Sequence, residues 1–195
     1  MSLADRLRAA FEDLPGIEPI EGDDVQHDGP HVPAAVLVAI TDRPEPGVIL
    51  TVRQPHLRRH AGQIAFPGGK IDPEDDGPVA AALREANEEI GLDPADVELV
   101  GSVDPYRTGS GYRIVTVIGV IPPDLVLAPH EAEVAKVFEV PLAFLIDARN
   151  HIRETMMLGD RERAFSVIQW EDKRIWGITA GLIVNLSRRL AGVAA

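Results

Sequence analysis

Cysteine is absent from the 195 residues of the sequence, which excludes disulfide bonds, thiolate nucleophiles and cysteine-ligated zinc sites together. The sequence also lacks an apolar run long enough to span a membrane, and its N-terminus lacks the basic region and apolar stretch of a secretion signal. We therefore expect a cytoplasmic protein. Hydrophobic residues make up 45% of the chain, which is enough for one globular domain with a full core.

Positive charge is scarce, since 19 lysines and arginines face 31 aspartates and glutamates and leave a net charge of −12. Such a charge opposes non-specific attraction to nucleic acid or to anionic lipid, so we expect neither nucleic acid nor a membrane as a partner. A local basic patch is still able to hold a phosphorylated small molecule.

The two signs of charge are separated along the chain. No acidic residue occurs between Glu45 and Asp72, whereas acids are dense from Asp72 to Asp104 and Arg84 is the one base there. A polyphosphate needs both regions, because cations bind its outer phosphates and a carboxylate-held divalent metal serves the reacting one. The alternative is a surface whose charge is uneven by chance. The basic residues and histidines of the acid-free stretch are Arg53, His56, Arg58, Arg59, His60 and Lys70.

A helix is predicted with Pro78 in its first turn and with Gly91 as a left-handed stop. Glu85, Glu88 and Glu89 share one turn of this helix. Like charges three and four residues apart destabilise a bare helix by roughly 0.2–0.5 kcal/mol per pair. The cluster must therefore be solvated, paired with bases or bridged by a cation.

On a helical wheel the three glutamates lie roughly opposite the apolar stripe of the helix, so we expect them to converge on a ligand without entering the core. Arg84 lies beside them, within reach of Glu88. The apolar stripe consists of Val79, Leu83, Ala86 and Ile90.

Strands and helices are expected to alternate irregularly along the chain, which favours a mixed α/β or α+β sandwich over a doubly wound sheet. We expect residues 1–33 to form a helix and a linker packed on a single domain of residues 34–195. Further helices are predicted at 2–13 and 177–190, and strands at 34–40, 48–53, 97–103, 112–121 and 134–140, with a hairpin from 164 to 176 that turns near Asp172.

The glutamate helix and the glycine loop before it resemble the box motif of the Nudix hydrolase family. The order of residues matches, with two departures: the first acid is an aspartate, Asp75 or Asp76, and the gap from it to Arg84 is one residue longer than in the motif. The residues that carry the resemblance are Gly69, Asp75, Arg84, Glu85, Glu88, Glu89, Gly91 and Leu92.

This resemblance implies an α/β/α sandwich with a mixed β-sheet between helices, in which the loop and helix bind Mg²⁺ or Mn²⁺ over a diphosphate. It makes Glu85 and Glu89 metal ligands together with the backbone carbonyl of Gly69. Glu88 would bind another ion or be held by Arg84.

The implied reaction is attack of water on phosphorus, which needs a base outside the helix. Glu133 is the candidate and Glu131 the second choice, while the alternative for Glu133 is a solvated loop acid. Glu85, Glu133 and Arg84 are the residues expected to serve catalysis. The oligomeric state stays open, a homodimer included.

A second block, Leu50–Arg53 with Leu57–Gly69, resembles the additional signature of the coenzyme A diphosphatase branch of this family. That resemblance implies hydrolysis of coenzyme A or its derivatives to 4′-phosphopantetheine, or its acyl form, and adenosine 3′,5′-bisphosphate. The alternatives are an enzyme for another nucleoside diphosphate derivative, such as ADP-ribose or a dinucleotide, and a module that binds phosphorylated ligands without catalysis. The side chains expected to bind substrate are Arg53, Arg58, His60, Gln63 and Lys70.

Overall fold

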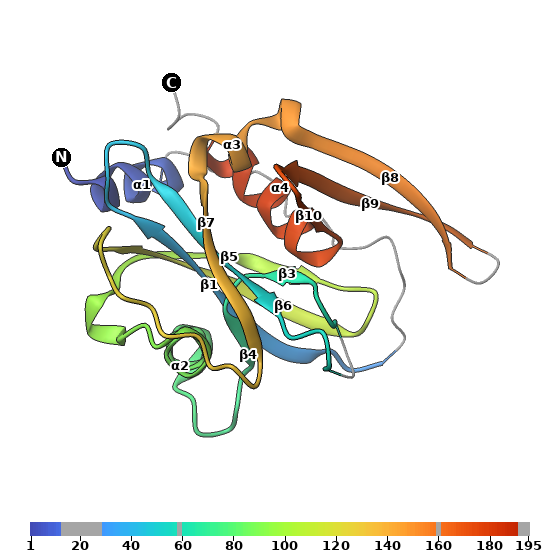
Figure 1. Ribbon diagram of the computed structural model, residues 1–195, viewed down its shortest axis with the longest axis horizontal. Helices are drawn as coiled ribbons and strands as arrows, with labels where there is room; N and C mark the ends of the chain where they lie inside the picture. The colour runs from blue at the N-terminus through green and yellow to red at the C-terminus, as the bar shows by residue number, and fades with distance from the viewer. Residues whose placement is uncertain (13–28, 58–59, 159–160, 191–195) are drawn as a thin grey trace.

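The computed structural model of the protein describes residues 1–12, 29–57, 60–158 and 161–190. A mixed seven-stranded sheet lies between layers of helix (Figure 1). Each face of the sheet has its own apolar core. The predicted α+β sandwich is confirmed. Helix α2 (Gly77–Ile90) covers one face of the sheet, and the other face carries α1 (Leu3–Glu12), α3 (Leu142–Ile146) and α4 (Ile178–Leu190).

Strand β1 (Val32–Thr41) organises the sheet, because strands pair with it on both sides. It runs parallel to β6 along its whole length, from the Val32–Tyr112 pair to the Thr41–Ile121 pair. On its other edge it pairs antiparallel with β4, and at Ile40 and Val48 with β2. The other strands are β2 (Gly47–Arg53), β3 (Ile64–Ala65), β4 (Gly68–Lys70), β5 (Glu98–Arg107), β6 (Tyr112–Ile121) and β7 (Val134–Pro141).

Strand β2 continues beyond β1 between two partners, β3 and β7. Its last residue, Arg53, lies opposite Val134, the first residue of β7. Thus the end of β2, the segment of β3 and β4, and the loop before β7 meet on one side of the sheet. The predicted strands are all present, and β6 has the predicted bounds.

Helix α2 begins and ends as the sequence predicts. Pro78 is in its first turn, and Gly91 follows its end with a φ of 67°, donating its N–H to the carbonyl of Asn87 at 2.9 Å. The buried face differs from the predicted stripe, because Val79 and Leu83 lie at its margin and are half-buried. Its centre is a run of small residues that are fully buried against the sheet, Ala81, Ala82 and Ala86, with Ile90.

The opposite layer is held together by α1, α3 and α4. Leu7 of α1 and Ile183 of α4 are buried in the same cluster as Ile118 of β6. Arg8 of α1 also donates to the carbonyl of Leu99 at 2.6 Å, which ties the helix to β5. The linker predicted after this helix lies mostly outside the described residues. Among the described helices, none combines the length and apolarity needed to cross a membrane.

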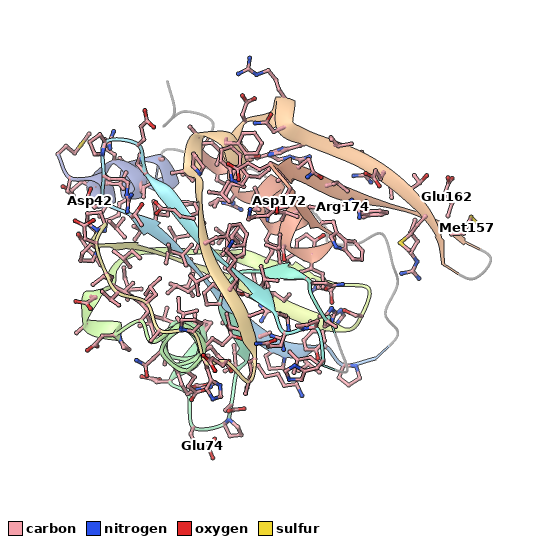
Figure 2. The ribbon with its side chains drawn as sticks, in the orientation of Figure 1. Asp42, Glu74, Met157, Glu162, Asp172 and Arg174 are labelled. Atoms are coloured by element: carbon pink, nitrogen blue, oxygen red, sulfur yellow. The ribbon has the colours of Figure 1, made fainter. Side chains whose placement is uncertain are left out.

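A second, three-stranded sheet extends from the body of the protein (Figure 1). The predicted hairpin is present, with the turn at Glu171 and Asp172. Its first strand pairs on the other edge with a strand that was not predicted, and Figure 2 shows Met157 and Glu162, which lie opposite each other, near the far end of this ribbon. The three strands are β8 (His151–Leu158), β9 (Arg161–Trp170) and β10 (Lys173–Trp176).

Candidate metal centre

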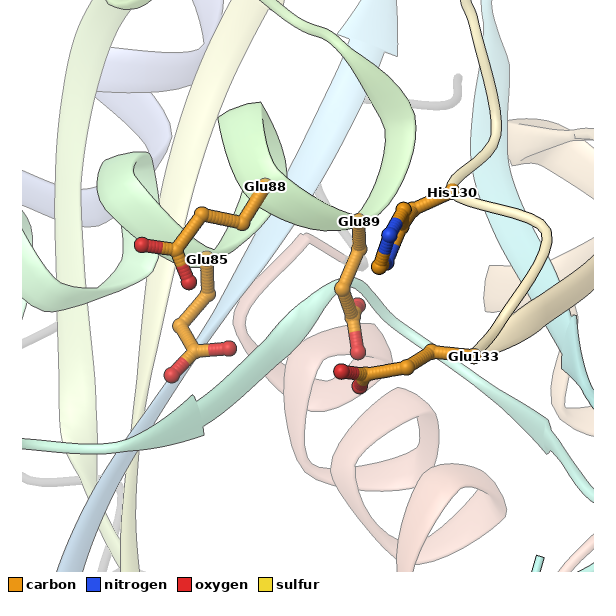
Figure 3. Close-up of a pocket in the computed structure, with 5 residues that line it drawn as sticks. All are labelled: Glu85, Glu88, Glu89, His130 and Glu133. Atoms are coloured by element: carbon orange, nitrogen blue, oxygen red, sulfur yellow. The ribbon is translucent and has the colours of Figure 1, made fainter.

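A cavity of about 330 Å³ lies beside the second half of α2 (Figure 3). Glu85, Glu88 and Glu89 of the helix line it, and His130 and Glu133 enter it from the loop before β7. The structure therefore brings the candidate base Glu133 to the three helical glutamates, although more than 40 residues separate them along the chain.

Backbone hydrogen bonds fix the loop that carries Glu133. The carbonyls of Glu89 and Ile90, at the end of α2, accept from the N–H groups of His130 and Ala128, each at 2.8 Å. These carbonyls have no partner within the helix, so the loop completes its hydrogen bonding. The carbonyl of His130 then accepts from the N–H of Glu133 at 2.9 Å, which closes a turn.

Gln54, the residue after β2, holds the other side of this loop. Its N–H donates to the carbonyl of Glu133 at 2.8 Å, and its side-chain amide donates to the carbonyl of Glu131 at 2.7 Å. The loop is thus fastened to both α2 and β2. Glu131, the second candidate base, contributes a backbone carbonyl here, and its side chain is not among the described residues that line the cavity.

The three helical glutamates differ in burial. The side chain of Glu88 is 59% exposed and that of Glu85 is 18% exposed, whereas that of Glu89 is 6% exposed. The expectation that all three avoid the core is wrong for Glu89. Seven residues are almost two full turns, so Glu89 lies within about 20° of the buried Ala82. The predicted apolar stripe did not include Ala82.

The surroundings of Glu89 would compensate a negative charge on its carboxylate poorly. Burial raises the pKa of Glu89 to about 7, against the opposing effects of the Gly68 N–H and Arg53. The Gly68 N–H lies 3.2 Å from one carboxylate oxygen, and Nη1 of Arg53 lies 3.5 Å from the other. Burial also raises the pKa of Glu85, against the lowering effect of Arg84. Two carboxylates that resist ionisation beside each other are suited to a cation.

Arg84 pairs with several carboxylates at once. Its Nη1 donates to Glu85 at 3.0 Å and to Glu88 at 3.2 Å, as the helical spacing predicts for the second contact. Its Nε and Nη2 each donate to Asp75 at 2.9 Å. Hydrogen bonds from Arg84 lower the pKa of Asp75 to about 2. Of the two candidates for the first acid of the motif, Asp75 and not Asp76 is therefore the one that binds Arg84.

The donors present fit a hard divalent ion. The Glu85 carboxylate lies directly against the backbone of Gly69, so that a Cβ placed on Gly69 would overlap it. A side chain at position 69 would displace the Glu85 carboxylate from this position, so the glycine leaves it room beside the backbone that the family resemblance makes part of the metal site. Within the described residues, no three acidic, histidine or cysteine side chains are already gathered around one point. Mg²⁺ retains several waters, so one or two carboxylates and substrate oxygens suffice.

The predicted substrate-binding residues that the structure describes are not among the described residues that line the cavity. Arg53 contacts Glu89, and the exposed Lys70 ends β4, where its carbonyl accepts from Arg84 at 3.2 Å. His60 and Gln63 contact each other, with Nδ1 and Oε1 2.8 Å apart. Arg58 lies outside the described residues.

His130 is a lining residue that the sequence did not single out. In the sequence His130 belongs to no motif, because no other metal-binding or catalytic residue type stands at a characteristic spacing from it. Its position in the structure depends on the docking of its loop on α2. The neighbouring Glu131 and Glu133 could have indicated His130 as a site residue. A loop that is proposed to bring a base to the cavity brings its other polar residues close to the cavity as well.

Residues 30–158 match the family model of the NUDIX domain. The chain belongs to the Nudix family. Relatives named "Uncharacterized Nudix hydrolase NudL" support this, one from Escherichia coli O7:K1 with 45% identity and one from Shigella boydii serotype 4 with 46%. Each alignment spans 162 residues, which are 82% of this chain and 83% of the relative. The predicted family is confirmed, and the coenzyme A branch stays a prediction.

Solved structures of Nudix proteins share the fold. A Nudix hydrolase from M. smegmatis, RenU, has a TM-score of 0.51 and 25% identity over 62% of this chain and 80% of its own. A MutT/nudix family protein from Enterococcus faecalis has a TM-score of 0.52 over 98% of this chain and 70% of its own. Its 20% identity makes it a comparison of fold alone.

Proposed function

We propose that this Nudix protein hydrolyses the diphosphate linkage of coenzyme A or its derivatives in the presence of Mg²⁺ or Mn²⁺. The products would be 4′-phosphopantetheine, or its acyl form, and adenosine 3′,5′-bisphosphate. The observation that carries the reaction class is the meeting of the α2 glutamates with Glu133 around one cavity. The upstream block of residues 50–69 carries the choice of substrate.

Glu85, Glu89 and the backbone carbonyl of Gly69 would hold the divalent ion. Glu88 is paired with Arg84 and is the most exposed of the three glutamates, so it is free to take a second ion only if that pair opens. When bound, the metal would supply positive charge at the phosphoryl oxygens and acidify a water molecule.

The chain's own residues perform the proton transfer. Glu133 would accept a proton from the attacking water as its oxygen forms a bond to one phosphorus. The bond from that phosphorus to the bridging oxygen breaks, and this oxygen leaves with the bonding electron pair on the other phosphate. Arg84 keeps Glu85 in place through its 3.0 Å contact, while Asp75 fixes Arg84.

The size and surroundings of the cavity support a substrate that extends beyond it. A volume of about 330 Å³ is at the lower end for small-molecule sites, which suits the diphosphate and its metal. The rest of coenzyme A would then lie outside the cavity. Lys70 follows Gly69 at the end of β4, and His60 precedes β3; both residues are exposed. Arg53 is the last residue of β2. These groups, with Gln63 and Arg58, are the proposed contacts for the additional phosphate and the adenosine.

Product analysis tests the proposal. The purified protein is incubated with coenzyme A and Mg²⁺ or Mn²⁺ in ¹⁸O-labelled water, and the products are separated and weighed. Equal amounts of the two named products, one carrying a single ¹⁸O, are expected. Glu89→Gln serves as the inactive control, and Asp76→Asn as the matched control, since the Asp76 side chain makes no capping hydrogen bond.

A substrate panel separates the alternatives. If ADP-ribose or a dinucleotide is cleaved and coenzyme A is not, the reaction class holds and the choice of substrate is wrong. If coenzyme A binds with Mg²⁺ and none of the panel is cleaved, the protein is a binding module. The RenU and NudL names do not state a substrate, so this panel carries the decision.

A further inference from the structure

The described lining of the cavity consists mainly of hydrogen-bond acceptors. Four of the five lining residues in Figure 3 are glutamates, whose ionised carboxylates only accept hydrogen bonds. A diphosphate brings more acceptor oxygens into the same space. A divalent ion bridges some of them to the carboxylates, and the remaining phosphate oxygens need hydrogen-bond donors.

The guanidinium groups near the cavity are engaged with carboxylates. Arg84 donates to Asp75, Glu85 and Glu88, and Arg53 faces the buried Glu89. Moving either one to a phosphate would leave a buried or half-buried carboxylate without its partner, which is costly. Among the described side chains that line the cavity, His130 is the one that carries an N–H donor.

The position of His130 is fixed by its own backbone. Its N–H donates to the carbonyl of Glu89 at 2.8 Å, and its carbonyl accepts from Glu133 and Val134, each at 2.9 Å. In Figure 3 its ring lies alongside the Glu89 side chain and above Glu133. His130 is an exposed residue that lines the cavity, so a ligand in the cavity can reach it.

We propose that His130 is a substrate-binding residue, which donates its imidazole N–H to a non-bridging oxygen of the diphosphate. The proposal rests on the proposed function for the nature of the ligand. An imidazole ring carries at least one N–H donor in each of its forms, so His130 is able to make this contact. A hydrogen bond to a charged phosphate oxygen is worth about tenfold to a hundredfold in affinity.

Variants at His130 leave the loop's anchoring intact, because the backbone makes those contacts. His130→Ala removes the donor, while His130→Asn keeps a side-chain N–H of similar reach. Asp124→Ala is the matched control, since Asp124 is an exposed residue of the same connection between β6 and β7. Thermal unfolding confirms that each variant is folded.

Two binding measurements and one kinetic measurement test the proposal. The first is the affinity for α,β-methylene-ADP with Mg²⁺, a diphosphate that cannot be hydrolysed at its bridge. His130→Ala should weaken it about tenfold or more, and His130→Asn should recover part of the loss. The second is the affinity of the substrate-free protein for Mn²⁺, which should be unchanged. The third is cleavage of coenzyme A, in which KM should rise more than kcat falls.

The outcomes separate this inference from the proposed function. Wild-type affinity and KM in His130→Ala would overturn the inference, as would an equal loss of Mn²⁺ affinity without substrate, because the ring would then act on the metal. If the wild type binds the analogue through His130 but cleaves no coenzyme A, the proposed function alone fails. A wild type that does not bind the analogue overturns the inference, and cleavage of coenzyme A then decides the proposed function separately.

Discussion

Arg84 and Asp75 form a two-point ion pair, in which Nε donates to Oδ1 and Nη2 donates to Oδ2, each at 2.9 Å. This fork-to-carboxylate geometry fixes the plane of the guanidinium. The same plane carries Nη1 to Glu85 and Glu88. Asp75 thus sets the orientation of two cavity glutamates without lining the cavity itself.

Asp75→Asn should therefore impair catalysis from outside the cavity. An asparagine accepts only one of the two hydrogen bonds, so Arg84 would turn toward Glu85. It would then bind the Glu85 carboxylate more tightly and compete with a metal ion for it. We expect kcat/KM to fall about tenfold and the Mg²⁺ concentration for half-maximal activity to rise. Steady-state rates across a Mg²⁺ series measure both. Asp76→Asn is the control, and equal rates for the two variants would show that Arg84 does not depend on Asp75.

Glu89→Gln should remove most of the activity, by about a hundredfold or more, because a buried metal ligand loses its charge. The fold should persist, since the amide oxygen can still accept from the Gly68 N–H. Kinetics with Mn²⁺ and far-ultraviolet circular dichroism check the two statements. Near-normal turnover in a folded Glu89→Gln protein would exclude Glu89 as a metal ligand.

The stability of the metal-free protein should fall as pH rises from about 4.5 to 7. In that window the folded protein keeps a proton on Glu89 that the unfolded chain has lost, because burial raises the pKa of Glu89 from 4.5 to about 7. Stability from this group is complete below pH 4.5 and is lost as pH passes 7. The shift corresponds to at most roughly 3 kcal/mol.

Thermal unfolding in a chelator, from pH 5 to pH 8, measures this loss. Glu89→Gln should be more stable than the wild type at pH 8 and nearly equal at pH 5. Glu88→Gln is the control in the same helical turn, where the side chain is exposed. Added Mg²⁺ should stabilise the wild type more at pH 8 than at pH 5. Parallel pH profiles for the wild type and Glu89→Gln would contradict the role of burial.

Gln54→Ala should lower kcat about tenfold with little change in KM for substrate. The variant loses the 2.7 Å bond to the Glu131 carbonyl and loosens the loop that presents Glu133. Gln169→Ala is a matched control, because Gln169 also donates to a backbone carbonyl, that of Glu171 at 2.8 Å, in the distant β9–β10 turn. Initial rates of the two variants compare them directly, and equal kcat values would show that the loop holds without Gln54.

The sequence predicted the local features of α2 well. Pro78 and Gly91 act on the backbone within one turn, so the start and stop of the helix follow from the residues themselves. The Arg84–Glu88 contact likewise depends on helical spacing alone. The family follows from the order of these same residues, and the NUDIX match confirms it.

Features that depend on contacts distant in sequence were not predictable in the same way. Glu89 is buried because the alanine face of α2 lies against the sheet, and an alanine carries little signal on a helical wheel. In strand β8 the apolar residues Ile152, Met156 and Met157 do not alternate with polar ones and are exposed, so its pattern shows no buried face. His130 reaches the cavity through the hydrogen bonds that fasten its loop to the end of α2 and to Gln54.

The docking of residues 128–134 on the end of α2 divides the β6–β7 connection into two parts with different tolerance to change in length. Leu125 and Leu127, before the first anchor at Ala128, pack against the core that contains α2, so insertions should leave the cavity intact only ahead of them, at residues 122–124. Hydrogen bonds fix both ends of the interval from Ala128 to Val134, because Ala128 and His130 donate to the end of α2 and Val134 donates to the carbonyl of His130. Adding or removing one residue in that interval would carry a different side chain to the position of Glu133.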